Sequence, residues 1–98
     1  MVLHHLLRHL GEIMRPTLKD WGFDGRSLTG KVYDHPGRFE DGKFIRTSSL
    51  QEVFYEGDTL VGRCKSREYV LDGIDPEYEV QFPNAINRFL RRSEDDKN

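Results

Sequence analysis

Large hydrophobic side chains recur every three or four residues near the start of the chain, and histidine and charged side chains fill the positions between them. On a wheel at about 100° per residue these hydrophobic side chains gather on one side, as in an amphipathic helix. They are Leu3, Leu6, Leu7, Leu10, Ile13 and Met14. Since proline disfavours helical angles at the residue before it, Pro16 ends the pattern, which predicts a helix over Val2–Met14.

Between Gly30 and Leu71, short hydrophobic runs alternate with turn-forming residues, a pattern typical of a meander of short antiparallel strands. The predicted strands are Leu28–Asp34, Lys43–Thr47, Leu50–Tyr55, Thr59–Lys65 and Glu68–Leu71. The turns Glu56-Gly57-Asp58 and Lys65-Ser66-Arg67 are short enough to close hairpins. The last three strands are therefore expected to pair in sequence order.

The segments on either side of the meander are less regular. Lys19–Gly25 is interpreted as a connector, with a helical turn over Thr17–Trp21 as an alternative. After the meander, the pattern favours a loop with a brief strand over Tyr78–Phe82. A short helix is predicted over Asn84–Arg92, because its hydrophobic residues share one side.

These elements predict one α+β domain over residues 1–92 and a disordered acidic tail over residues 93–98. Five short strands need closure or cover to be stable. We therefore expect the N-terminal amphipathic helix to pack on a curved antiparallel sheet or a small SH3-like barrel, followed by the short C-terminal helix. An alternative use of the N-terminal helix is as the seam of a homo-oligomer.

Composition narrows the class of protein. The chain has 98 residues, of which 36% are hydrophobic and 33% charged, as in a globular domain. The net charge of −2 equals that of the acidic tail, and a neutral body argues against strong binding to duplex nucleic acid. No hydrophobic run approaches the roughly 18 residues that span a bilayer. A single cysteine, Cys64, excludes an intramolecular disulfide, so we expect a cytoplasmic protein.

Arginines form the most interesting candidate chemistry, in two sets. The meander arginines are Arg38, Arg46, Arg63 and Arg67, and the C-terminal arginines are Arg88, Arg91 and Arg92. Guanidinium groups suit phosphates, and with Phe39, Tyr33 or Tyr69 nearby they would complete a pocket that stacks a base and holds its phosphate. The alternative is ordinary surface ion pairing with the abundant acidic residues.

Other candidate chemistry is weaker. His5, His9 and Glu12 lie on one side of the predicted helix, at a spacing that lets two imidazoles reach one metal ion. Without an obvious completing ligand, apart from His35, a solvated polar face is favoured, so no metal site and no cofactor are predicted. Cys64 is expected to be a buried, inert thiol.

His35 could act as a base near the acidic residues of its turn, but no nucleophile or reacting group is evident beside it. The hydroxyls of Thr47, Ser48 and Ser49 are expected to satisfy backbone groups. The sequence therefore predicts no catalytic residue and a protein that is not an enzyme.

One string resembles a known family. Residues 30–48, GKVYDHPGRFEDGKFIRTS, continuing to Tyr69-Val70-Leu71, resemble short uncharacterised proteins found mainly in phage and prophage genomes. These proteins share the pattern G-x-V-x-x-H-P-x-F-x-D-G-x-x-I-x-T-S and a later x-Y-x-L strand. The motif turn is matched by His35, Pro36, Asp41 and Gly42, whereas Gly37 is an extra residue. The resemblance implies a viral or mobile-element origin, and small accessory proteins of that origin often block host defence components.

Together, these observations predict a non-enzymatic, phage-type accessory or counter-defence binding protein in the host cytosol. It would block a host protein, through the acidic tail and an exposed face of the sheet, or sequester a nucleotide signal, with the C-terminal arginines holding phosphates across a subunit interface. The alternative is a small-barrel nucleic-acid-binding protein that uses Arg46, Arg63 and Arg67 together with aromatic stacking. No membrane partner is predicted.

Overall fold

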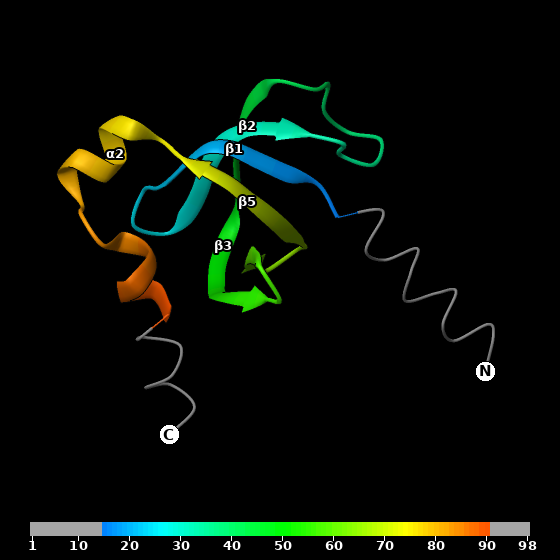
Figure 1. Cartoon of the computed structure of the whole chain (residues 1–98). Helices are drawn as coiled ribbons and strands as arrows, with labels where there is room; N and C mark the ends of the chain where they lie inside the picture. The colour runs from blue at the N-terminus through cyan, green and yellow to red at the C-terminus, as the bar shows by residue number, and fades with distance from the viewer. Residues whose placement is uncertain (1–14, 91–98) are drawn as a thin grey trace, which may run out of the picture.

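A computed structural model describes residues 15–90 of the chain. Its five strands are β1 (Thr17–Phe23), β2 (Ser27–Tyr33), β3 (Lys43–Glu56), β4 (Thr59–Cys64) and β5 (Glu68–Ile74). The helix α2 (Pro76–Gln81) follows, and residues 85–90 form a further helical segment. Figure 1 shows both helical segments together on one side of the coiled sheet.

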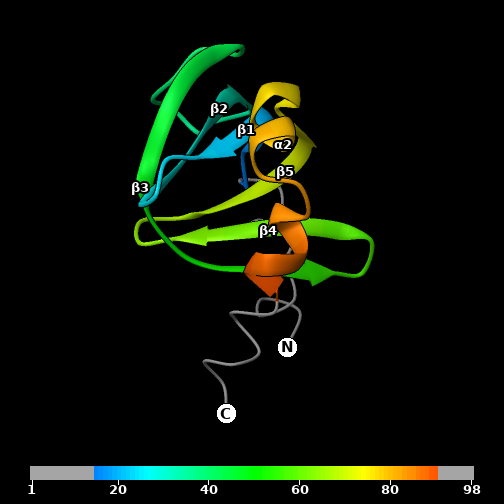
Figure 2. The same cartoon turned by 90° about the vertical axis from the view of Figure 1, so that its left-hand side faces the viewer.

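The sheet closes on itself. Each strand pairs antiparallel with the next one, and β1 pairs parallel with β5 to complete a barrel. The parallel seam follows from the up-and-down order, in which the first and fifth strands run in the same direction. β3 pairs with β2 through its first half and with β4 through its second half, and Figure 2 shows it curving along one side of the barrel.

All five strands contribute to the core of the barrel. The buried hydrophobic side chains on the strands are Leu18, Trp21, Leu28, Val32, Ile45, Val53, Leu60, Val61, Cys64, Tyr69 and Leu71. The burial of each large hydrophobic side chain stabilises the folded state by roughly 1.5–3 kcal/mol. The strands therefore supply a closely packed interior for themselves.

The predicted fold class, an α+β domain with a helix packed on a curved sheet or SH3-like barrel, is wrong. Residues 15–90 are mainly a five-stranded antiparallel sheet with two short helices after it. The helix expected over Val2–Met14 and the oligomer seam assigned to it lie outside the described residues, as does the tail over 93–98. The simpler prediction of a small domain with an antiparallel sheet is confirmed.

The connector expected over Lys19–Gly25 is also wrong, because this segment belongs mainly to β1. A bulge between Lys19 and Gly22 interrupts the pairing with β2, and Asp20 within it has a φ of 50°. Leu18 and Trp21 both become buried although they are three residues apart. A spacing of three residues is typical of a helix, so the sequence pattern does not indicate a strand here.

After the barrel, the brief strand expected over Tyr78–Phe82 is wrong, because this region contains most of α2. The Asp75 carboxylate caps the helix by accepting the N–H of Tyr78 at 3.3 Å, and Pro76 occupies its first turn. The helix expected over Asn84–Arg92 corresponds, in the described part of the chain, to residues 85–90. Neither helix here is long and apolar enough to cross a membrane.

Candidate ligand-binding site

The loop between β2 and β3 meets the β4–β5 end of the barrel at a cluster of rings. The His35 ring lies edge-on to Phe39 with centroids 4.9 Å apart, and 6.4 Å from the ring of Tyr69. Tyr69 is a buried residue of β5, so it anchors the loop to the barrel. The loop projects from the barrel next to β2, as Figure 1 shows.

Three cations surround these rings. The Arg38 guanidinium and the Lys43 ammonium each lie 5.6 Å from the centroid of the Phe39 ring. Arg67, in the turn after β4, is near enough for its charge to act on His35 and Tyr69. We call these six residues, His35, Arg38, Phe39, Lys43, Arg67 and Tyr69, the loop cluster. Its three cations make no ion pair within residues 15–90.

Backbone hydrogen bonds hold the loop in shape. The N–H of Gly42 donates to the carbonyl of Val32 at 2.7 Å, and the Asp41 carboxylate accepts the N–H of Asp34 at 2.8 Å. Gly42 has a φ of 86°, in the left-handed region that favours glycine. The motif residues Asp41 and Gly42 therefore shape the loop, whereas His35 belongs to the cluster itself.

The surroundings of His35 oppose its protonation. Burial, and then the positive charges of Arg67 and Arg38, lower its pKa. Its Nδ1 atom is buried and has no hydrogen-bond partner in the described part of the chain. Burial also raises the pKa of Tyr69, and the two arginines act in the opposite direction.

The lowered pKa of His35 predicts that the protein loses stability in mild acid. The unfolded chain takes up a proton at this residue near its ordinary pKa of 6.5, whereas the folded chain does so only at lower pH. The free energy of unfolding should therefore fall as the pH drops from 6.5 through the folded-state pKa.

Urea unfolding of the protein and of His35→Gln between about pH 5 and pH 7.5 tests this. The free energy of unfolding should fall less with decreasing pH in the variant than in the wild type. His4, His5 and His9 remain in both proteins as an internal control. If the free energy of unfolding changes with pH in the same way in both proteins, the loss of stability in acid does not come from His35.

The other predicted arginines are not part of the loop cluster. Arg46 pairs with Asp24, and this hydrogen bond, with those from the N–H groups of Ser27 and Arg26, holds the pKa of Asp24 well below its usual range. Arg63 pairs with Glu52 on the adjacent strand at 3.2 Å. Arg46 and Arg63 therefore form surface ion pairs with acidic residues, which was the alternative to a binding role. Arg88 lies in the helical segment 85–90, and Arg91 and Arg92 lie outside the described residues.

The remaining candidates also have clear positions. Burial raises the pKa of the Cys64 thiol, which donates to the Thr47 hydroxyl at 3.3 Å, as expected for an inert thiol. His5, His9 and Glu12 lie outside the described residues. Within residues 15–90, no group of three or more His, Cys, Asp or Glu side chains is placed to hold a metal ion.

The cluster contains two residues whose part in it was not predicted. Lys43 follows the motif turn directly, and its position at the start of a strand beside Phe39 was the available signal. His35 was considered as a base, although it lies between two rings and two cations. Comparison with models of protein families, with curated proteins and with solved structures finds no match for this chain.

Proposed function

We propose that this chain is a non-enzymatic binding protein whose loop cluster holds a nucleotide, as a planar ring linked to phosphate. The observation that supports it is the gathering of Arg38, Lys43 and Arg67 around three rings without an ion pair inside residues 15–90. Like charges repel one another, so such a group is best explained by an anion that it receives.

Each part of the cluster has a role in this proposal. The guanidinium groups of Arg38 and Arg67 bind phosphate oxygens in pairs, and Lys43 adds a point charge. The Phe39 ring offers a face for stacking of the base. His35, held neutral, adds no further positive charge and supports the Phe39 ring from its edge.

A free nucleotide and a nucleotide unit of a single strand present the same chemistry. The neutral body favours the free nucleotide, because binding to a strand without sequence preference relies on a basic groove. The second candidate is the single strand, favoured by the exposed positions of Arg38 and Lys43. The phage-type role, blocking of a host protein and location in the cytosol stay predictions from the sequence.

Calorimetric titration with ATP, with inorganic phosphate and with oligo(dT) of about ten nucleotides tests the proposal. The double variant Arg38→Gln/Arg67→Gln should weaken ATP binding by about 100-fold or more, since each charged hydrogen bond contributes about 1.5–3 kcal/mol. Phe39→Leu should cost about tenfold through lost stacking. The control is Lys65→Gln, which removes an exposed charge from the same turn as Arg67 and should leave binding unchanged.

The outcomes separate the two sources. ATP binding that depends on the two arginines supports a free nucleotide. Binding of the oligonucleotide alone, with steep salt dependence, supports the single strand. If neither ATP nor the oligonucleotide binds, or if the double variant binds as well as the wild type, the proposal is overturned.

A further inference from the structure

A hollow lies between the turn after β1 and the two helical segments. Within the described part of the chain, four rings line it, those of Phe23, Tyr78, Phe82 and Phe89, with the charged side chains of Asp24 and Arg88. We call these six residues the aromatic pocket. Its volume is about 540 Å³, which falls within the range of small-molecule sites.

The rings hold one another in place. Phe23 and Phe89 meet edge to face with centroids 5.2 Å apart. The ring centroids of Tyr78 and Phe82 are 5.0 Å apart, and their ring planes are inclined by 37°. Trp21 is fully buried in the barrel and packs against two of these rings. Its ring centroid lies 6.3 Å from that of Tyr78 and 6.4 Å from that of Phe89. Phe82 nevertheless remains 45% exposed, so the pocket leaves a large hydrophobic ring in contact with water.

The charges of the pocket favour an anion. Asp24 is already occupied, because it pairs with Arg46 and accepts the N–H groups of Arg26 and Ser27 at 3.0 and 2.8 Å. Arg88 makes no ion pair within residues 15–90. Arg88 and Tyr78 both line the pocket, and the charge of Arg88 opposes the rise that burial causes in the pKa of Tyr78.

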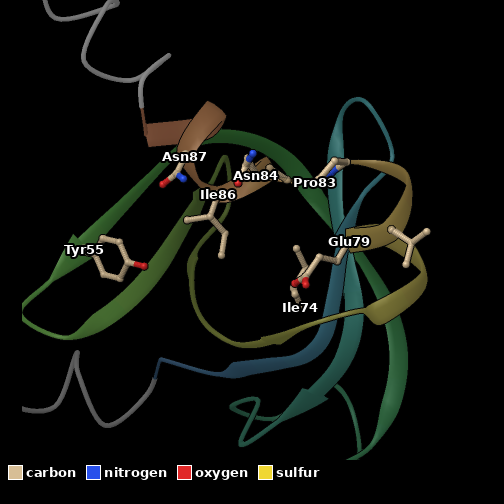
Figure 3. Close-up of a pocket in the computed structure, with 9 residues that line it drawn as sticks. Tyr55, Ile74, Glu79, Pro83, Asn84, Ile86 and Asn87 are labelled. Atoms are coloured by element: carbon tan, nitrogen blue, oxygen red, sulfur yellow. The ribbon is translucent and has the colours of Figure 1, made fainter.

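A neighbouring hollow of about 550 Å³ has the opposite character. Figure 3 shows Ile86 and Asn87 of the helical segment facing Tyr55 of the β3–β4 hairpin across it, with Glu79 beside Ile74. Among residues 15–90, its lining contains Glu79 and no cation. An anionic ligand is therefore expected to distinguish the aromatic pocket from this hollow.

We infer that the aromatic pocket is a second binding site, which takes a planar aromatic ring bearing one anionic group. The ring lies against Phe82 and Phe89, and the anion pairs with Arg88. The site is formed by different residues from the loop cluster, so this inference does not depend on the proposed function.

Two probes of similar shape and different charge test the inference. 8-Anilinonaphthalene-1-sulfonate carries the anion, and N-phenyl-1-naphthylamine lacks it. Trp21, the single tryptophan, contacts two pocket rings and should report binding by energy transfer to either probe. The sulfonate should bind the aromatic pocket saturably, about tenfold or more tightly than the neutral probe, and should raise the melting temperature of the folded protein.

Three variants separate the contributions. Arg88→Gln should reduce the affinity of the sulfonate to that of the neutral probe, while the neutral probe is unaffected. Phe82→Ala should weaken both probes, and its exposed position makes loss of the fold unexpected. The matched control, Lys65→Gln, removes an exposed charge that lies in neither the aromatic pocket nor the loop cluster and should change neither affinity.

Equal binding of both probes to the wild type would overturn the inference, as would unchanged sulfonate binding by Arg88→Gln. Binding at several unsaturable sites without a rise in melting temperature would also overturn it, since partly folded chains bind such dyes. Failure of nucleotides to bind the loop cluster would leave these outcomes unchanged.

Discussion

Gly30→Ala is expected to lower the free energy of unfolding by about 2–5 kcal/mol. Gly30 lies in β2 opposite the bulge of β1 and has a φ of 155°. A Cβ at this position would come within 3.0 Å of the Lys19 carbonyl oxygen and 3.2 Å of the Trp21 Cα. Both are backbone atoms of a paired strand, so the barrel must distort to admit the methyl group.

Chemical unfolding monitored by the fluorescence of buried Trp21 measures this loss. Gly37→Ala is the matched control, because Gly37 also has a positive φ, of 91°, but has no atom within 4 Å of the added Cβ. It should lose only the local backbone term, about 1 kcal/mol. Equal losses for the two variants would show that close approach of the strands is not what requires Gly30.

Thr47→Val is expected to cost about 1–3 kcal/mol although the two side chains have nearly the same shape. The buried Thr47 hydroxyl accepts the backbone N–H of Leu28 at 3.0 Å. The register of β2 with β3 shifts between Ser27 and Thr29, so Leu28 has no opposite residue there, and the hydroxyl replaces a strand partner. Valine would leave this buried N–H without an acceptor.

Amide hydrogen exchange at Leu28 gives the most direct measurement. Its protection should fall in Thr47→Val beyond the fall in global stability. Thr47→Ser, which keeps the hydroxyl and loses a methyl group, should retain the protection of Leu28. If Leu28 stays equally protected in the valine variant, the hydroxyl is not its essential acceptor.

The sequence predicted the local parts of this fold better than the non-local ones. The hairpin around Gly57 is confirmed, because its turn chemistry and strand alternation lie within a few residues of each other. β1 was missed because a bulge changes its period, and the bulge exists only through pairing with β2. At α2, the alternation of Tyr78, Val80 and Phe82 suggested a strand, although Asp75 and Pro76 carried the signal of a helix start.

The candidate site shows the same division. Phe39 and Arg38 are adjacent in sequence, so their association was predictable. The pairing of Arg46 with Asp24 joins residues 22 apart, and that of Arg63 with Glu52 joins residues 11 apart. The register of β3 with β4 places Arg63 opposite Glu52, and the turn after β1 brings Asp24 to Arg46; composition reveals neither arrangement. This is why the predicted arginine set was larger than the cluster that the structure brings together.

The parallel seam between β1 and β5 has a consequence for the kinetics of folding. Thr17 pairs with Val70 and Trp21 with Ile74, so the seam joins segments some 50 residues apart. The chain loses the entropy of closing this long loop before the seam returns any stabilisation. The β3–β4 hairpin, closed by a two-residue turn, should therefore form early and the seam late. Folding speed in this domain is thus expected to depend on the meeting of its first and last strands.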